Sequence, residues 1–367
     1  MRKLTSDAKN RELGVSSQLL RRARKSRVLL AFVAAGACAG SASAQSSVTI
    51  FGIIDETLRD VKNGSGGSLK SLTNGGYQGN RLGFRGAEDL GDGLEAIFWL
   101  EHGFNADTGT QADATKFWNR KAIAGLRSKT LGEIRLGRDL TPSYLAFASN
   151  DPTADNGLAG ISSNVNGLGS GVLTIVRADN LVSYLLPDTL GGAFGQASVA
   201  PGEGTVGAKY AGGALGWRND LLRVSASYAE TTITTDKYKQ ALIGGNYDFG
   251  IIRVYAQFIQ SKYRASKQSL YYAAASVPVG LGSIRASYAL SNLSGPAVAG
   301  QALADADDSS RISLGYAYNL SKRSTLYATV ATLQNKGAAK VTLSGGPAGL
   351  RSGESSRGFE MGLRHAF

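Results

Sequence analysis

The chain has 367 residues, a formal net charge of +12 and a single cysteine. The first 44 positions hold nine Lys and Arg but only two Asp and Glu, so the remaining residues carry a formal charge of +5. The positive charge is therefore mainly a property of the N-terminal segment, and it is weak support for nucleic-acid binding.

The N-terminal segment has the three parts of a secretory signal peptide. The basic stretch RRARKSR (21–27) precedes the apolar run VLLAFVAAGACAG, and SASA (41–44) contains an A-x-A cleavage pattern. We expect a signal peptide over 1–44 and a mature chain over 45–367, without cysteine and therefore without disulfides. The alternative is a lipoprotein signal at Cys38, but the preceding Ala-Gly-Ala lacks the large apolar residue expected three places before such a cysteine.

Beyond residue 44 the sequence consists of short alternating segments separated by turn-forming residues, with almost no helical periodicity. No apolar run approaches the roughly 18 residues that a spanning helix needs. The pattern predicts sixteen strands, at about 47–61, 78–89, 93–104, 117–127, 132–139, 177–186, 193–200, 206–218, 221–231, 239–249, 251–261, 269–277, 282–292, 310–319, 325–334 and 357–367.

The connections between these segments alternate between short and long. Tight turns such as LGDG (90–93) and LSKRS (320–324) alternate mostly with long polar stretches, while 201–205 and 232–238 are shorter exceptions. A barrel in an outer membrane has this arrangement, with short periplasmic turns and long external loops. The long stretches are 62–77, 105–116, 140–176, 293–309 and 335–356.

Polar and apolar residues alternate within the segments. In RISLGYAYNL (311–320), Ile312 and Leu314 share one face while Arg311 and Ser313 share the other. A buried core could not hold many unpaired arginines, whereas a water-filled lumen can. The arginines in or next to strands are Arg81, Arg85, Arg120, Arg135, Arg138, Arg223, Arg253 and Arg285. We therefore predict an all-β fold, a sixteen-stranded antiparallel transmembrane barrel.

Aromatic residues lie near several strand ends. Tyr247, Phe249, Tyr318 and Tyr327 could belong to the aromatic girdles at the two membrane interfaces. The alternative is the ordinary preference of tyrosine for strands.

Seven stretches in order resemble the trimeric general porins of Gram-negative bacteria, particularly the beta-proteobacterial type, and together they span the mature chain. The resemblance implies a homotrimer in the outer membrane that contacts lipid and lipopolysaccharide, with no cofactor and no metal. The stretches are SSVTIFGIIDETL (46–58), NRLGFRGAEDLGDGLEAIFWLEHGFN (80–105), FWNRKAIAGLRS (117–128), LGEIRLGR (131–138), RADNLVSYLLP (177–187), GYAYNLSKRSTLYA (315–328) and GLRHAF (362–367).

The last strand ends on Phe367 and alternates apolar residues with small or charged ones. The resemblance implies that the outer-membrane assembly machinery reads this strand, with Phe367 as part of the signal. The same strand must pair with the first, because an open edge in lipid would leave backbone groups unsatisfied.

The resemblance also implies that the connection at 140–176 folds into the barrel and narrows the channel. It carries Asp151 and Asp155, and arginines on the facing wall would create a transverse field. The matching strands offer Arg81, Arg120 and Arg177, with Arg138 and Arg85 as further candidates. Two features depart from the family: Ser183 stands where an Arg is often found, and the loop lacks the PEFGG run of enterobacterial relatives.

The resemblance implies that the outer faces of about the first five strands meet neighbouring subunits, with the loop at 105–116 reaching across. Close packing of barrels favours small residues, and Gly52, Ala124 and Gly125 are available.

Catalysis is not expected. His102 and His365 are the only histidines, and neither has a paired nucleophile of the Ser-His-Asp kind nearby in the sequence. The run DADD (305–308) could hold a cation or could be a solvated loop, and NGSGGS (63–68) has the composition of a flexible loop.

The sequence therefore predicts a porin that passes small hydrophilic solutes and ions by diffusion, with a mild preference for anions. Two alternatives remain. One is a selective channel for sugars or organic anions, and the other is a barrel whose loops mainly bind partners, as in an adhesin or phage receptor.

Overall fold

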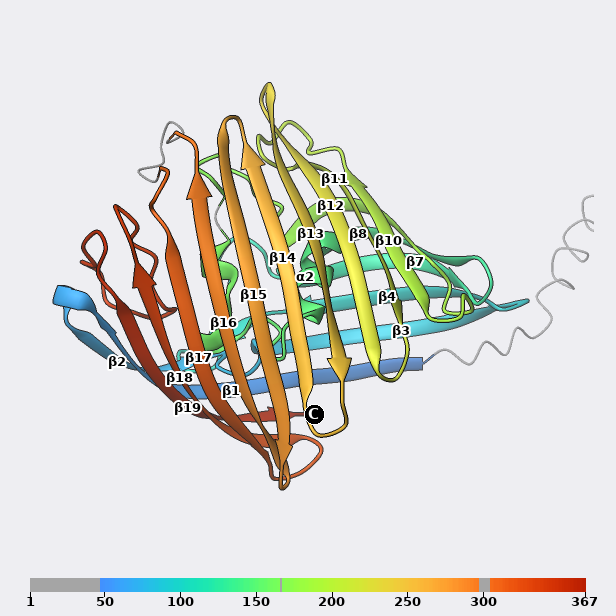
Figure 1. Cartoon of the computed structure of the whole chain (residues 1–367). Coiled ribbons are helices and arrows are strands. Elements are labelled where there is room, and N and C mark those ends of the chain that lie inside the picture. Colours follow the sequence, from blue (N-terminus) through green and yellow to red (C-terminus); the bar gives the residue numbers. More distant parts are fainter. Residues whose placement is uncertain (1–46, 166, 297–303) are drawn as a thin grey trace, which may run out of the picture. The chain divides into compact units, whose positions relative to one another are not determined.

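The computed structural model describes residues 47–165, 167–296 and 304–367 (Figure 1). The predicted signal peptide (1–44), its cleavage site and Gln45 lie outside these residues. Within the described part, antiparallel strands predominate, as the alternating sequence predicts.

Sixteen of the described strands form the wall of a closed barrel. Each strand pairs antiparallel with the next, and the last pairs with the first, so no edge is left open to lipid. This confirms the predicted fold. The wall strands are β1 (Ser47–Asn63), β3 (Arg81–Gly91), β4 (Leu94–His102), β7 (Lys121–Ser128), β8 (Gly132–Leu140), β9 (Arg177–Leu185), β10 (Ala193–Ala200), β11 (Lys209–Arg218), β12 (Leu222–Ile233), β13 (Asp236–Asp248), β14 (Arg253–Tyr263), β15 (Ser266–Val279), β16 (Gly282–Ser294), β17 (Ser309–Asn319), β18 (Ser324–Asn335) and β19 (Ser356–Ala366).

Three shorter strands lie in the connections. β2 (Ser68–Asn74) pairs with the second half of β1, along the same edge where β3 pairs with its first half. The stretch 63–68, whose composition suggested a flexible loop, therefore contains a short 3₁₀ helix, η1 (Gly64–Gly66), and the start of β2. β5 (Phe104–Asn105) and β6 (Thr110–Gln111) form a small hairpin between β4 and β7.

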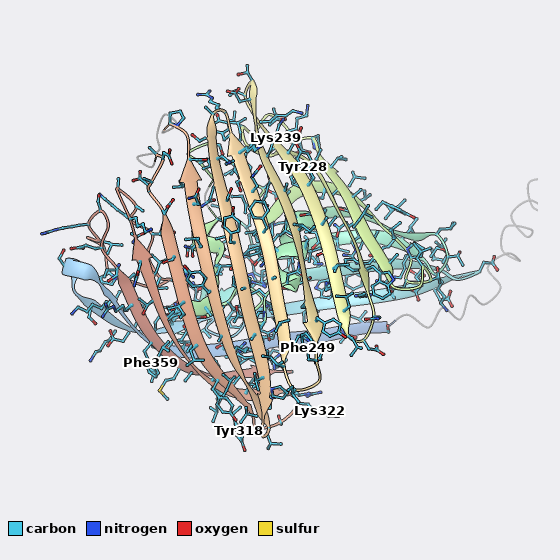
Figure 2. The ribbon with its side chains drawn as sticks, viewed as in Figure 1. Tyr228, Lys239, Phe249, Tyr318, Lys322 and Phe359 are labelled. Carbon is cyan, nitrogen blue, oxygen red and sulfur yellow. The ribbon has the colours of Figure 1, made fainter. Side chains whose placement is uncertain are left out.

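The two faces of the wall differ as the alternation predicts. On β17, Ile312 and Leu314 are exposed on the outside, whereas Arg311 and Ser313 are buried inside. Figure 2 shows labelled residues near both ends of the barrel, with Tyr228 and Lys239 near one end and Phe249, Tyr318 and Lys322 near the other.

Tyr327 contradicts the girdle prediction. It shares the inner face of β18 with Thr325 and Thr329, and its hydroxyl forms short hydrogen bonds with Thr57 and Asp55 of β1. Successive side chains of a strand point to opposite faces, so an aromatic residue near a strand end can point into the lumen instead of toward the membrane. Its position along the strand alone therefore does not identify a girdle residue.

Short connections lie at one end of the barrel, the short-turn end, and long connections lie mostly at the other, the long-loop end. Two connections at the long-loop end are exceptions. β12 joins β13 through only Thr234 and Thr235, and β14 joins β15 through only Arg264 and Ala265. Thr234 and Arg264 adopt positive φ, which suits tight hairpin turns. The polar stretch at 232–238 is therefore mostly strand, and these two hairpins extend beyond their neighbours as long ribbons (Figure 1).

The connection from β8 to β9 folds inside the barrel, as predicted (Figure 1). It begins with α2 (Pro142–Ser149), whose first turn is capped by Thr141 Oγ1 accepting from the Tyr144 amide at 3.3 Å. Two 3₁₀ turns follow, η2 (Gly157–Ala159) and η3 (Ser162–Asn164). Among the described residues, no helix has both the length and the apolar character needed to cross a membrane.

Apolar contacts hold this inner loop against the wall. Phe147 and Ile161 pack with Leu242, Ile259 and Leu270 on β13 to β15. Burying a side chain of this size contributes roughly 1.5–3 kcal/mol relative to exposure. The loop is thus fixed on one side of the lumen, which leaves the opposite wall, formed by β3, β4 and the strands next to them, facing open space.

Candidate functional site

Asp151 of the inner loop is an anchor. Its carboxylate accepts hydrogen bonds from Tyr272 Oη of β15 at 2.7 Å, from the Thr153 amide at 2.9 Å and from the Asp155 amide at 2.9 Å. Only 5% of the residue is exposed. The structure therefore places Asp151, which was predicted to line the constriction, against the wall that holds the inner loop. Its carboxylate oxygens accept hydrogen bonds from that wall and from the loop itself.

Asp155 lies on the same loop and is bonded to Tyr144, whose hydroxyl donates to its carboxylate at 3.1 Å. The carboxylate also accepts from the Ser162 amide at 2.8 Å. Burial raises the pKa of Asp155 to about 6, and the nearby charge of Asp151 adds to this effect. Asp155 can thus change its charge close to neutral pH.

Tyr144 lies between the acidic loop and the basic wall. Burial and the adjacent Asp155 raise its pKa, while the charges of Arg177 and Arg120 act in the opposite direction. The hydroxyl therefore stays protonated near neutral pH and remains a donor. Sequence reasoning missed this residue because a tyrosine in a loop carries no pattern that distinguishes it.

The basic wall is centred on Glu101 of β4. Its Oε1 atom is 2.6 Å from Nε of Arg120 and 3.3 Å from Nη1 of Arg81. The carboxylate is 7% exposed, so one largely buried acid holds two arginines in fixed positions. Glu101 was also missed, although it lies on the inner face of its strand with Ile97 and Trp99, a parity visible in the sequence.

Arg177 and Arg138 extend this basic wall. Arg177 Nε donates to the carbonyl of Arg120 at 2.9 Å, which places a third guanidinium beside the two that pair with Glu101. Arg138 donates from Nε to the carbonyl of Asn119 at 2.7 Å and lies 2.5 Å from Asp179, which also pairs with Lys116. We call Arg81, Arg120, Arg138 and Arg177 the arginine wall.

Arg85 lies apart from the arginine wall. It follows Arg81 by four residues on β3, a distance of about 13 Å along a strand, toward the short-turn end. Its guanidinium lies over Phe51 and Trp99, which belong to β1 and β4. The structure therefore brings together four of the five predicted arginines and separates the fifth.

Side chains of β17 and β19 hold the second half of the inner loop, at residues 158–163. Arg311 of β17 forms short hydrogen bonds with the Gly160 carbonyl and Ser163, and its charge reaches both Asp151 and Asp155. Glu360 of β19 accepts from the Leu158 amide at 2.8 Å and pairs with Arg59 of β1 at 2.7 Å. Arg311 and Glu360 are 148 to 202 positions away from their partners in the loop, so only the fold identifies them.

Phe367 completes the closure of the barrel. Its amide donates to the Gly52 carbonyl and its carbonyl accepts from the Gly52 amide, both at 3.1 Å. The ring lies on the outer surface, where a Cβ at position 52 would overlap it.

The groups considered for other chemistry have local partners. His102 stacks on Phe117 with ring centroids 4.2 Å apart, and His365 bonds Ser324 at 2.9 Å. In the DADD run, Asp307 and Asp308 accept hydrogen bonds from backbone amides. Among the described residues, no group of three or more His, Cys, Asp or Glu is placed to hold a metal ion.

Comparisons with known proteins agree with this geometry. Residues 30–338 match the family of Gram-negative porins. The chain is 34% identical to outer membrane porin protein 32 of Delftia acidovorans, over 94% of this chain and all of that protein. It is 29% identical to an outer membrane porin protein of Bordetella pertussis, over 82% of this chain and 92% of that one.

Solved structures give the same result. The anion-selective porin from Comamonas acidovorans superposes with a TM-score of 0.78 at 33% identity, covering 88% of this chain and all of that one. A trimer form of OmpT from Vibrio cholerae superposes with a TM-score of 0.63 at 18% identity, covering 88% of this chain and 99% of that one, a likeness of fold alone.

Proposed function

Because the chain belongs to the Gram-negative porin family, and so is an outer-membrane porin, we propose that its channel is constricted between the arginine wall and the inner loop and prefers small anions. One observation carries the proposal: Arg81 and Arg120 both pair with the single carboxylate of Glu101, and Arg177 lies beside them on the Arg120 carbonyl. The excess positive charge faces a water-filled passage. The 33% identical porin from Comamonas acidovorans is described as anion-selective, which supports this sign.

The preference should be mild. Water in the lumen keeps the effective dielectric high, and salt screens charges over about 10 Å at 0.1 M and about 3 Å at 1 M. Asp155 on the opposite side offsets part of the positive field when it is ionised.

The reversal potential in a tenfold KCl gradient tests the proposal. Chloride should pass ahead of potassium in the wild type, and Arg81→Ser with Arg120→Ser should move the channel toward cations. The matched control is Lys322→Ser with Arg323→Ser, which removes the same charge from a short turn (Figure 2). If the two pairs of substitutions shift the potential equally, the arginine wall does not line the constriction.

Single-channel conductance separates the two alternatives. Ohmic steps without saturation identify a general diffusion channel, saturation by one sugar or organic anion identifies a selective channel, and no conductance identifies a barrel that mainly binds partners. We assign no reaction to the protein and propose that it is not an enzyme and that it is exported with a cleaved signal peptide.

We further propose a homotrimer formed through the outer faces of β1 to β8, where Val48, Ile50, Leu126 and Leu136 are exposed. Two of the three small residues predicted for this interface are unsuitable. Gly52 is covered by the Phe367 ring, and Gly125 shares the inner face of β7 with Ile123. Light scattering of the unheated, detergent-extracted protein tests the trimer, and a monomer would contradict it.

Lipopolysaccharide phosphates are the proposed partners of a row of lysines on the outer surface at the long-loop end. Lys239, labelled in Figure 2, stands opposite Lys262 in the β13–β14 register. Lys262 stands opposite Lys267 in the β14–β15 register. Directly opposed like charges are destabilising unless an anion compensates them. Of these three lysines, only Lys239 lies near a carboxylate of the described residues, that of Glu230 at 3.7 Å. Lys262→Gln with Lys267→Gln should reduce co-purified lipopolysaccharide, whereas Lys322→Gln should not.

A further inference from the structure

A cavity separate from the arginine wall lies against the inner surface of β1, β3, β4, β7 and β8, nearer the short-turn end. Its volume is about 240 Å³. The lining combines apolar side chains with charged ones, the apolar being Ile97, Trp99 and Ile123 and the charged Arg85, Arg127, Arg135 and the carboxylate Glu133. Gly125 lies between Ile97 and Arg135 in the strand register, so no side chain fills the space there.

Arg85 supplies an uncompensated charge at this cavity. Its guanidinium carbon is 5.4 Å from the centroid of the Phe51 ring and 5.3 Å from that of Trp99, and the two rings meet edge to face. Among the residues that the structure describes, no carboxylate pairs with Arg85, and its side chain is exposed to the lumen. The rings hold the guanidinium in place without neutralising it.

The neighbouring cations are neutralised. Glu133 pairs with Arg127 at 2.8 Å and, more closely, with Arg135, and Glu95 lies 3.4 Å from Arg127. Asp139 pairs with Lys121 at 2.8 Å and with Arg135 at 3.3 Å. An anion that enters the cavity is therefore drawn to Arg85.

Apolar surface lies beside this charge. Ile97 and Ile123 line the cavity, although they are only 8% and 5% exposed, and the centroid of the Trp99 ring is 5.3 Å from Arg85 and 4.8 Å from Lys121. An apolar cavity of about 150 Å³ already accommodates benzene. Ligand pockets for larger molecules begin at about 300 Å³, so the occupant is limited to about one ring.

We propose that this cavity binds small aromatic carboxylates, with the carboxylate on Arg85 and the ring against Ile97, Ile123 and Trp99. The inference rests on the proposed function in one respect: a ligand reaches the cavity only through an open lumen. An inorganic anion would gain only the contact with Arg85, and a neutral ring only the apolar contacts. The site therefore favours a ligand that combines both groups.

Benzoate block of chloride current tests the site in planar bilayers. Wild-type channels should show benzoate blocks that outlast those of acetate or phosphate. Arg85→Gln should shorten them roughly 10- to 100-fold, because hydrogen bonds to a charged group are lost. Ala87→Leu, which keeps every charge and fills part of the cavity, should shorten them as well.

The matched control is Arg223→Gln. Arg223 also lies over an aromatic ring, Phe194, at 4.3 Å, but it does not line this cavity. Its substitution should leave the benzoate blocks unchanged. Equal effects of Arg223→Gln and Arg85→Gln, or wild-type blocks no longer than those of phosphate, would overturn the proposal.

Binding is also measured without current. 4-Nitrobenzoate should quench the tryptophan fluorescence of the detergent-solubilised protein through Trp99, and Arg85→Gln should weaken this quenching. If quenching is specific and the protein conducts no ions, the proposed channel function fails while the site stands. If the protein conducts anions and neither quenching nor block depends on Arg85, the site fails alone.

Discussion

The last residue of the chain, Phe367, exchanges both of its backbone hydrogen bonds with Gly52 in the first half of β1, and its ring occupies the place of a side chain at position 52. This pair is where the cylinder closes at the short-turn end. A Cβ at position 52 would also lie 2.8 Å from the Arg81 carbonyl oxygen, so a larger side chain there must displace the Phe367 ring and the neighbouring strand.

Gly52→Val should destabilise the closed barrel. Overpacking costs about 1–3 kcal/mol, and here the bulk would displace the ring from the closing strand pair. We expect the folded form to convert at a lower temperature in heat-modifiability gels. Gly213→Ala is the control, because it adds a Cβ to the outer face of β11 where the nearest atom is 3.2 Å away. Equal loss of heat resistance in both variants would contradict the special role of position 52.

Deleting Phe367 should leave export intact and impair insertion into the outer membrane. The deletion removes two closing hydrogen bonds and the terminal residue that the assembly machinery is proposed to read. Cell fractionation measures this effect. A deletion variant that reaches the outer membrane at wild-type yield and heat-modifiability would count against both roles.

Ion selectivity should depend on pH through Asp155. Its pKa is raised to about 6, so the carboxyl is neutral at pH 5 and negative at pH 7. The anion preference should therefore be stronger at pH 5. Asp155→Asn should hold the stronger preference at both pH values, and a variant that retains the full pH shift would show that another group is responsible.

The same group has a defined effect on stability. Between its ordinary pKa of 3.8 and the raised value of about 6, the folded protein binds more protons than the unfolded chain. The contribution of Asp155 to stability is present below this range and is lost as the pH rises through 6. Asp155→Asn should remove this part of the pH dependence of unfolding.

Glu360→Gln should loosen the inner loop. The substitution leaves Arg59 buried without its partner, which in comparable buried pairs costs about 3–5 kcal/mol, and weakens the bond to the Leu158 amide. We expect noisier single-channel current and lower heat resistance. The double substitution Arg59→Met with Glu360→Leu removes both charges. It should recover much of the heat resistance, but the single-channel current should stay noisier than that of the wild type. If the single-channel current of Glu360→Gln is no noisier than that of the wild type, Glu360 does not hold the loop.

The strands could be predicted from sequence because alternation is local. The constriction could be predicted only in part. Arg81 begins β3 and Arg120 directly precedes β7, but their shared partner Glu101 is identified only when these segments and β4 are brought together. Asp151 was expected to face the lumen, yet it bonds Tyr272, which is 121 positions away. The prediction ended two strands at 231 and 261 and began the next at 239 and 269, whereas the structure continues the strands to Ile233 and Tyr263 and begins the next at Asp236 and Ser266.

The pairing of β1 with β19 also determines when the fold can form. Eleven residue pairs join Ile53–Asn63 to Ser356–Ala366, so the first wall strand completes its hydrogen bonds only after the whole chain is available. Closing a loop of this length carries its entropic cost before the contacts compensate for it, and such non-local topologies fold slowly. Until then, β1 has an unpaired edge that is prone to pairing with other chains. The interval between export and closure is therefore when this protein most depends on chaperones, and a shortage of them should appear as aggregation of complete chains in the periplasm.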